Sequence, residues 1–508
     1  MEISLLDGIA FVVFIAIVIG VSLYASRKED TSEDYFLAGR GLSWGLIGFS
    51  LIASNISTEH FVGQAGAGFG SSGLAIASYE WVAAIVLVIV AIFLLPLFLR
   101  LGIYTMPEFL EHRYGSKARS LMAIYMMIAY VGVAMAAVLY SGAIGLTAIF
   151  GLDLNLGIWL IGILAGIYTI YGGLKAVVWS DLLQGGALLL GGAAVALIAL
   201  YAAGGLSEFL DKGQDKLHVI LPSDHSEIPW TALLAGIWIP NFFYWGFNQF
   251  ITQRTLGAKS LAQGQKGIML AAAIKLIIPF IIVFPGIMAF ELYSSQIPDG
   301  DQAYPILIKH LIPIGLRGIL FAALFGAIMS SLDSMLNSAS TIFTMDLYNK
   351  YIKPNSDSKK LVRVGRITTG ILVIFACIIA PLPAEFEGVY RYIQMIWGFI
   401  SPGIVAVFIF GMIFRKAPGS AALTAMILGI PVYGFLLWQF PEIAFLNHMA
   451  ITFGILILVM SIITLMKPLP EPYKFPTASK INLEPSAGAK YFGIGIIIIT
   501  LILYYTFW

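Results

Sequence analysis

The chain has 508 residues, of which 59% are hydrophobic and only 11% are charged, and its mean hydropathy is +0.90. This composition excludes an ordinary soluble globular protein and predicts an all-α polytopic membrane protein. The net charge of +1 gives no reason to expect a nucleic-acid partner. About fourteen apolar stretches approach the ~20 residues that a helix needs to cross a lipid bilayer. They fall near 7–25, 43–70, 74–100, 117–150, 156–171, 176–203, 230–253, 264–292, 314–349, 364–384, 388–414, 418–441, 446–467 and 488–507.

The first stretch and the loop charges predict the topology. Glu2 and Asp7, rather than basic residues, open this stretch, so we expect a retained helix and not a signal peptide. About 23 of the 29 Lys and Arg fall in one alternating set of loops, in which we count Arg254, Lys259 and Lys266. Such loops face the cytoplasm, so we expect a multi-pass protein of the cell (inner or plasma) membrane with both termini outside. The sequence holds no G-x-x-x-x-G-K-[ST] loop for ATP, and nothing in it requires an oligomer.

The second stretch is unusually polar for a membrane helix. From Ser50 to Gln64 it carries three serines, a threonine, Asn55 and His60. Such side chains compete with the backbone for hydrogen bonds. A break near 53–56 would leave backbone carbonyls and amides free, as in the discontinuous helices of transporters. The alternative is a helix–helix contact rich in small polar residues.

Two side chains of opposite charge lie within long apolar runs. Glu80 is near the start of the run 74–99, and Lys275 lies well inside the run 267–290. A charge at that depth costs at least ~2.5 kcal/mol and usually faces a cavity. The two residues therefore indicate a polar site inside a helix bundle.

Carboxylates and hydroxyls recur in the sixth and ninth stretches. Asp181 opens the sixth stretch, either as an interfacial residue at a helix start or as a ligand. In the ninth stretch Ser330 and Ser331 are followed by Asp333. Small hard cations take oxygen ligands, and a carboxylate in mid-span needs a partner, so this segment predicts a cation site. Hydroxyls that only bond the preceding turn are the alternative.

The seventh stretch places amides beside aromatic rings, with Asn241 and Asn248 on either side of Tyr244 and Trp245. A flat apolar face next to planar hydrogen-bonding groups suits a sugar. An interfacial aromatic belt is the alternative, but Asn241 lies too deep in its span for a belt. Gln394, in the eleventh stretch, adds another amide.

Together these segments resemble the sodium/solute symporter family and, within it, the sodium/glucose and sodium/galactose cotransporter branch. The resemblance covers nearly the whole chain in order. It rests on DYFLAGR at 34–40, ASNIS at 53–57, SYEW at 78–81, YGGLKAVVWSD at 171–181, NFFYWGFN at 241–248, SS at 330–331 and NSASTIFTMD at 337–346. It implies a LeuT-type fold, with inverted five-helix repeats at 43–203 and 230–414, one extra helix within 1–30 and three within 418–508.

The resemblance also implies a function and its residues. We expect a symporter, not an enzyme, that imports a galactose- or glucose-like monosaccharide with sodium by alternating access. The implied sugar-binding residues are Asn55, His60, Glu80, Asn241, Lys275 and Gln394. Tyr244, with Trp245 beside it, matches the aromatic that closes the site from inside.

The coupling ion has its own implied residues. The sodium ligands are the carbonyls of Ala53, Ile56 and Ala327 and the hydroxyls of Ser330 and Ser331. Relatives with a second sodium site use this turn of the ninth helix together with the aspartate that matches Asp181. We therefore hypothesise a second cation site at Asp181, Ser331 and Asp333.

Some positions depart from the family pattern. The bacterial galactose transporter of this branch carries Gln where this chain has His60, and animal glucose transporters carry His. We therefore expect His60 to bind a sugar hydroxyl and not to carry a proton. Gln64 and Trp397 also differ, which leaves the sugar open. A myo-inositol or other polyol symporter and a sodium-gated sugar sensor are alternatives. A membrane enzyme would need Glu80, Asp333 and His60 in one cavity.

Overall fold

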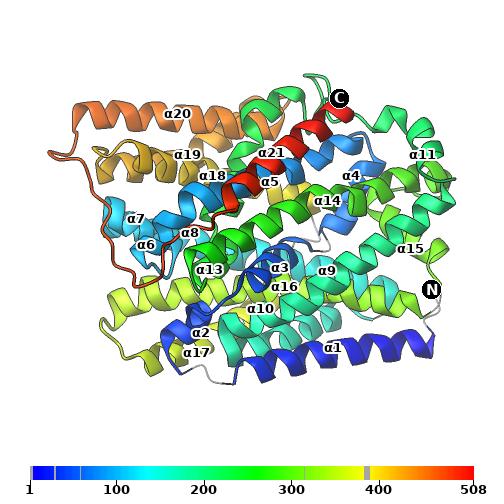
Figure 1. Ribbon diagram of the computed structural model, residues 1–508, viewed down its shortest axis with the longest axis horizontal. Helices are drawn as coiled ribbons and strands as arrows, with labels where there is room; N and C mark the ends of the chain where they lie inside the picture. Colours follow the sequence, from blue (N-terminus) through cyan, green and yellow to red (C-terminus); the bar gives the residue numbers. More distant parts are fainter. Residues whose placement is uncertain (1–3, 28–29, 58, 151, 314, 383–388) are drawn as a thin grey trace.

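The computed structural model describes residues 4–27, 30–57, 59–150, 152–313, 315–382 and 389–508, and these residues are mostly helical (Figure 1). The helices of the first half are α1 (Leu5–Ala25), α2 (Ser32–Leu37), α3 (Trp44–Asn55), α4 (Ala65–Phe69), α5 (Ser78–Ile89), α6 (Leu95–Leu101), α7 (Met106–Tyr114), α8 (Ser116–Ala129), α9 (Met135–Phe150), α10 (Leu154–Ala202) and α11 (Leu206–Lys212). Those of the second half are α12 (Trp238–Phe242), α13 (Gln249–Leu256), α14 (Leu261–Tyr293), α15 (Ala303–Leu311), α16 (Leu316–Ile342), α17 (Ser358–Ile379), α18 (Val389–Ile413), α19 (Gly419–Gln439), α20 (Phe445–Met466) and α21 (Ala489–Thr506).

Eleven helices of the described residues are long and apolar enough to cross a membrane, so the expected fourteen are not confirmed as a count of long helices. The difference has two sources. Two expected stretches, 156–171 and 176–203, lie in α10, whose two helices meet at a kink at Gly173 (φ 51°, ψ −145°). Two others are broken, and their apolar helices, Trp44–Asn55 and Ala232–Phe247, are each shorter than a span.

The break predicted in the second stretch is confirmed. Helix α3 ends at Asn55, and Ile56 is extended, with φ −80° and ψ 108°. The chain becomes helical again before α4, through a wider π-helical turn at His60–Gln64. A helix that ends inside the protein leaves its last carbonyls without N–H partners of its own.

A second break, which was not predicted, divides the seventh stretch. A π-helical turn, Phe243–Phe247, follows α12, and Asn248 is then extended, with φ −82° and ψ 125°. Tyr130 donates a hydrogen bond to the Asn248 side chain and also accepts one from the backbone N–H of Phe250, at 3.2 Å. The break is therefore stabilised from a neighbouring helix.

The broken helices lie in the middle of the bundle. Helix α14 packs against α3, α4 and α5, and α16 packs against α10 and α1. In Figure 1, α18, α19 and α20 form a group at the upper left, whereas α1 lies along the lower edge. This arrangement brings α3, α13, α14 and α16 together in the interior.

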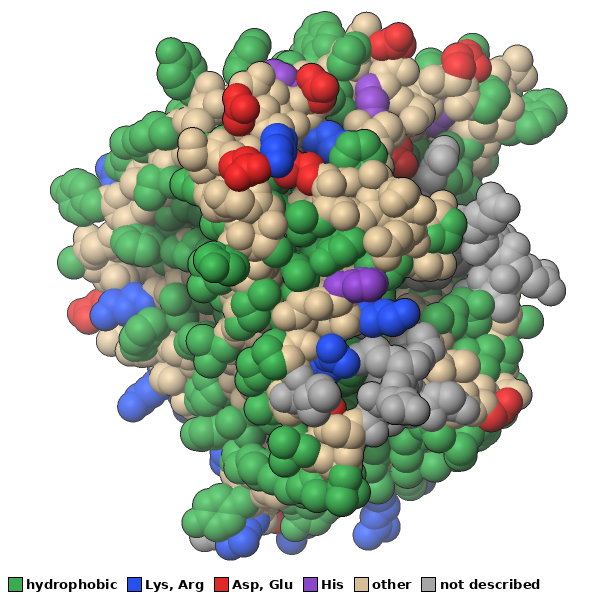
Figure 2. Space-filling model, turned by 90° about the vertical axis from the view of Figure 1, so that its right-hand side faces the viewer, with side chains coloured by type: hydrophobic (Ala, Val, Ile, Leu, Met, Phe, Trp, Pro, Cys, Tyr) green, Lys and Arg blue, Asp and Glu red, His purple; other side chains and the backbone are tan. Residues whose placement is uncertain are grey.

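The start of α1 and the end of α21 both lie toward the right-hand end of the molecule in Figure 1. Asp7 in α1 accepts hydrogen bonds from the backbone N–H groups of Gly315 (2.9 Å) and Gly318 (2.8 Å), at the start of α16. Nδ1 of His218 lies 2.6 Å from the carbonyl oxygen of Trp508. Charged and histidine side chains gather in the upper part of this end (Figure 2).

Candidate functional site

The two intramembrane charges identified in the sequence form an ion pair in the interior. Lys275 on α14 donates hydrogen bonds to the Glu80 carboxylate and to the amide oxygen of Asn55. Lys275 is 1% exposed and Glu80 2%, so neither charge is solvated by bulk water. Lys275 Nζ also lies 5.0 Å from the ring centroid of Trp245, where the ring face attracts a cation. The pairing offsets the cost of burying each charge.

One cavity, of about 80 Å³, surrounds this pair. All six residues expected to bind the substrate line it, together with Tyr244, Trp245, Gln64 and Trp397. Among the lining residues that the sequence analysis did not single out, two carry polar groups, Glu59 and Tyr79. A second hollow, lined in part by Glu227, Asp299 and Asp301, shares Tyr79 and Gln394 with the first. These two residues therefore lie between the central cavity and the hollow.

Hydrogen bonds within the cavity orient the side chains of Gln64 and His60. Gln64 donates a hydrogen bond from its amide nitrogen to Glu80 Oε1, at 2.9 Å. The backbone N–H of Ser57 points to His60 Nδ1 at 3.4 Å, whereas Nε2 lies 3.7 Å from Glu80 Oε1. Because Nδ1 accepts, we assign the proton of the neutral ring to Nε2. His60 therefore presents a hydrogen-bond donor to the cavity.

Aromatic rings form one wall of the cavity. Tyr244 packs edge-on against Trp245, at 5.2 Å between centroids, and against Phe250, at 5.4 Å. Asn241 donates to the carbonyl of Ile237 at 2.9 Å, which holds its amide on the same helical segment. Of the seventh stretch, Asn241, Tyr244 and Trp245 line the cavity. Asn248 does not, and its side chain accepts a hydrogen bond from Tyr130 instead.

The expected sodium ligands lie where α3 ends and α16 passes. Ser331 donates to the carbonyl of Ser54, at 3.3 Å, next to the break at Ile56. Ser330 instead donates to Asp181 Oδ1. The two neighbouring hydroxyls therefore point to different partners, one to the broken helix and one to α10.

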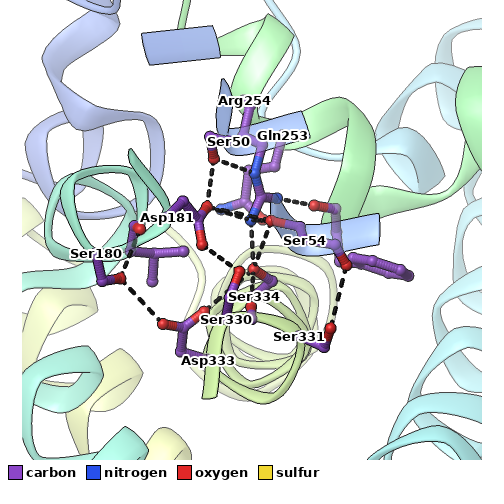
Figure 3. Close-up of polar contacts among 12 residues, drawn as sticks. Ser50, Ser54, Ser180, Asp181, Gln253, Arg254, Ser330, Ser331, Asp333 and Ser334 are labelled. Atoms are coloured by element: carbon purple, nitrogen blue, oxygen red, sulfur yellow. Dashed lines mark hydrogen bonds and ion pairs between the residues drawn. The ribbon is translucent and has the colours of Figure 1, made fainter. Parts of the chain in front are cut away.

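Asp181 and Arg254 form a second buried ion pair, with 3.2 Å between Oδ2 and Nη2 (Figure 3). Serine hydroxyls from α3 and α16 surround it. Asp181 accepts hydrogen bonds from Ser50, Ser54 and Ser330, and Arg254 donates to Ser50, Ser54 and Ser334. Both side chains are buried, so Asp181 is not an interfacial residue. The assignment of Arg254 to a cytoplasmic loop was wrong, because α13 packs against α3 and α16 and carries the residue inside.

Asp333 lies on the side of α16 that faces α10, whereas Ser331 points to the end of α3. Its carboxylate accepts hydrogen bonds from Tyr168, at 2.5 Å, and from Ser180, at 3.2 Å. Figure 3 draws Asp333 and Ser331 on opposite sides of α16, as expected for helix positions two apart. The structure therefore does not bring Ser331 and Asp333 to one point, although Asp181 lies near the hydroxyls of the same helix.

A signal for Arg254 was present in the sequence. It stands in the polar run 252–255, shortly after the aromatic segment, in a chain with few charged residues. Glu59 likewise adjoins His60 in the polar second stretch. Neither was recognised, because depth in the bundle depends on where the helices break.

Comparisons with known proteins agree with this architecture. A family model described as the sodium:solute symporter family matches residues 35–429. The sodium/glucose cotransporter of Vibrio parahaemolyticus is 40% identical, over 99% of this chain and 98% of its own length. The sodium/myo-inositol cotransporter 2 of Oryctolagus cuniculus is 34% identical, over 85% of this chain and 69% of its own length.

A solved structure supports the fold. The substrate-bound, outward-open state of a Na⁺-coupled sialic acid symporter superposes with a TM-score of 0.83 at 23% identity. The match covers 93% of this chain and 100% of the symporter chain. The fold is thus the LeuT type expected from the sequence. On the family match and the identity to full-length relatives, the chain belongs to the sodium:solute symporter family.

Proposed function

We propose that the protein imports a galactose- or glucose-like hexose together with sodium by alternating access. Membership of the family makes it a sodium-coupled secondary transporter and not an enzyme. The observation that carries the hexose proposal is the single cavity in which the Glu80–Lys275 pair meets amides and aromatic rings. A polyol is the second candidate, because a sodium/myo-inositol cotransporter is also a relative.

The cavity can satisfy the hydroxyls of a hexose in both directions. The Glu80 carboxylate accepts hydrogen bonds, the Lys275 ammonium donates them, and the amides of Asn55, Asn241 and Gln394 do both. His60 donates from Nε2 in the assigned tautomer. The rings of Tyr244 and Trp245 offer the flat apolar surface on which a sugar ring stacks. We assign Tyr244 as the inner gate, with Trp245 beside it.

We propose that sodium binds between the broken helix and α16. The ligands are the carbonyls of Ala53, Ile56 and Ala327 and the hydroxyls of Ser330 and Ser331. The contact of Ser331 with the Ser54 carbonyl supports this assignment, since it brings a hydroxyl to a helix end, where the last carbonyls have no N–H partner within the helix. Oxygen ligands of this kind suit a small hard cation.

We also propose a second cation site centred on Asp181, with Asp333 and the hydroxyls of α16 near it. The supporting observation is a buried carboxylate surrounded by serine oxygens. Each sodium that moves inward contributes about 2.3 kcal/mol per 100 mV of membrane potential. A second ion therefore raises the ratio of inside to outside solute concentration that the transporter can reach.

Coupling follows from neighbouring residues of one helix. Ser54 contacts Ser331, and the next residue, Asn55, accepts a hydrogen bond from Lys275 in the sugar cavity. Sodium that orders the end of α3 thereby orders Asn55 and strengthens binding of the sugar, and the sugar strengthens binding of sodium to the same extent. Release of sodium to the cytoplasm then frees the sugar past Tyr244.

The remaining proposals concern organisation. We propose inverted repeats at 43–203 and 230–414, supported by one break in the first helix of each, at Ile56 and at Asn248. We propose a cell-membrane location with both termini outside, from the distribution of basic loops. No ATP, nucleic acid or oligomeric partner enters this scheme.

Uptake by purified protein in liposomes tests the proposal. We expect labelled galactose or glucose to accumulate only under an inward sodium gradient, and unlabelled hexoses to compete better than myo-inositol. Stronger competition by myo-inositol would move the assignment to a polyol. Binding of a sugar without any flux would indicate a sensor and overturn the transport proposal.

A further inference from the structure

The guanidinium of Arg254 lies beside the Asp181 carboxylate, among serine hydroxyls. Its guanidinium bonds Ser50 Oγ at 2.6 Å, lies 3.2 Å from Asp181 Oδ2, and donates to Ser54 and Ser334 (Figure 3). All of these partners are oxygen atoms, the ligand type that a hard cation prefers. Within the described part of the chain, no other Lys or Arg lies within 4.0 Å of this carboxylate.

The helix that carries Arg254 is a separate half-helix. Helix α13 begins at Gln249, directly after the extended residue Asn248. An extended residue is a point at which a short helix can change direction relative to the segment before it. A small movement of α13 therefore changes the distance between Arg254 and Asp181 without unfolding either helix.

We propose that Arg254 is a tethered cation that alternates with the coupling cation at Asp181. When sodium leaves, the guanidinium pairs with the carboxylate. When sodium binds, Arg254 is displaced with α13. This inference rests on the proposed second cation site at Asp181. It adds an explanation of how sodium is released, since the Arg254 guanidinium keeps the Asp181 carboxylate paired after the ion has left.

The same contact links release of the ion to the sugar cavity. Ser54 accepts a hydrogen bond from Arg254, its carbonyl accepts one from Ser331, and Asn55 beside it contacts Lys275. Displacement of Arg254 thus acts on the last turn of α3, where the first sodium ligands and the sugar-binding amide meet. A permanent structural ion pair would require no such alternation.

Equilibrium binding of ²²Na⁺ to purified protein tests the inference, with Arg254→Gln compared with wild type. We expect Arg254→Gln to bind sodium at least about tenfold more tightly, because a positive charge about 4 Å away is removed from a poorly solvated site. Its turnover in liposomes should fall, since sodium then leaves more slowly. The double variant Asp181→Asn with Arg254→Gln should lose the tightening.

Arg113→Gln is the matched control. This buried arginine binds the carbonyls of Gly411, Phe414 and Ala417 and contacts no carboxylate in the described residues, so its loss should leave sodium affinity within about twofold. If Arg254→Gln cannot be purified folded, Arg254→Lys keeps the charge but loses the forked contacts, and it should tighten sodium binding about two- to fivefold.

Unchanged or weaker sodium binding in whichever of the two Arg254 variants folds would overturn the inference. Such a result leaves the proposed function standing, provided that wild type binds sodium and Asp181→Asn weakens that binding. If Asp181→Asn has no effect on sodium, the second cation site itself is wrong. The two failures are therefore distinguishable in one set of proteins.

Discussion

Removing the charges of the sugar cavity one at a time, and then together, separates their role in stability from their role in binding. The variants are Glu80→Gln, Lys275→Met and the two combined. Each single change leaves the other buried charge without its ion-pair partner, which costs about 3–5 kcal/mol. In Glu80→Gln, Lys275 keeps neutral partners, which are Asn55, the face of Trp245 and the new amide oxygen, but it loses the negative charge of its ion pair. Both single variants should therefore melt well below the wild type.

The double variant should behave differently in the two assays. Replacing a buried ion pair by neutral side chains of similar volume is often neutral for stability, so its melting temperature should return close to that of the wild type. A hydrogen bond between a sugar hydroxyl and a charged group contributes about 1.5–3 kcal/mol. At 1.4 kcal/mol per tenfold, the loss of one such bond should raise the KM for sugar about 10- to 100-fold.

Thermal unfolding followed by fluorescence and sugar uptake in liposomes are the two assays. The exposed pair of Glu208 and Lys212 is the matched control, and Glu208→Gln with Lys212→Met should change neither result. A double variant that regains stability and also keeps the wild-type KM would refute the reasoning, because the pair would then serve folding alone. Single variants as stable as the wild type would refute the burial of the two charges against each other.

Three further changes test the other assignments. Ser331→Ala removes the hydroxyl at the Ser54 carbonyl, so sodium should no longer stimulate uptake. An unaltered sodium dependence of the initial uptake rates would contradict the assignment of Ser331 as a sodium ligand. Asp333→Ala should reduce the charge carried per sugar, measured from the reversal potential in liposomes, and an unchanged ratio would return this residue to a structural role. Gln394→Glu should raise the KM for sugar about tenfold or more, because an amide donor is lost. Equilibrium sodium binding should stay the same, and a loss of sodium binding along with sugar binding would contradict a role confined to the sugar.

Several features could be predicted because they depend on local composition. Glu80 and Lys275 are conspicuous in apolar runs, and a buried charge requires a partner, so their pairing follows from the cost of burial. The break at Ile56 follows from serines, Asn55 and neighbouring polar residues in one helix, since these groups compete for backbone hydrogen bonds. The structure confirms both.

Other features depend on tertiary packing and could not be read locally. The break at Asn248 lies between Phe247 and Phe250 in an apolar segment, and Tyr130, far away in the chain, helps to stabilise it. Without that break, Arg254 counts as a basic residue at the end of a span. Its position beside Asp181 depends on how α13 packs against α3 and α16.

The sequence also could not predict the direction in which each serine hydroxyl of α16 points. Ser330 and Ser331 are adjacent in sequence and were assigned to one ion, but a helix turns neighbouring side chains by about 100°. One of them faces Asp181 and the other the end of α3. Asp333 faces Tyr168 and Ser180, which lie in the two halves of α10. The types of these residues indicated polar contacts, but their partners depend on how α16 packs in the bundle.

Paired flux measurements test the central claim most directly. Uptake of ²²Na⁺ and of labelled galactose would be followed in the same liposomes, with and without an ionophore that dissipates the sodium gradient. We predict that each flux requires the other solute, that they keep a fixed ratio, and that sugar accumulation disappears with the gradient. Sugar entry at the same rate without sodium, or sodium entry unaffected by any sugar or polyol, would contradict coupled transport through this cavity.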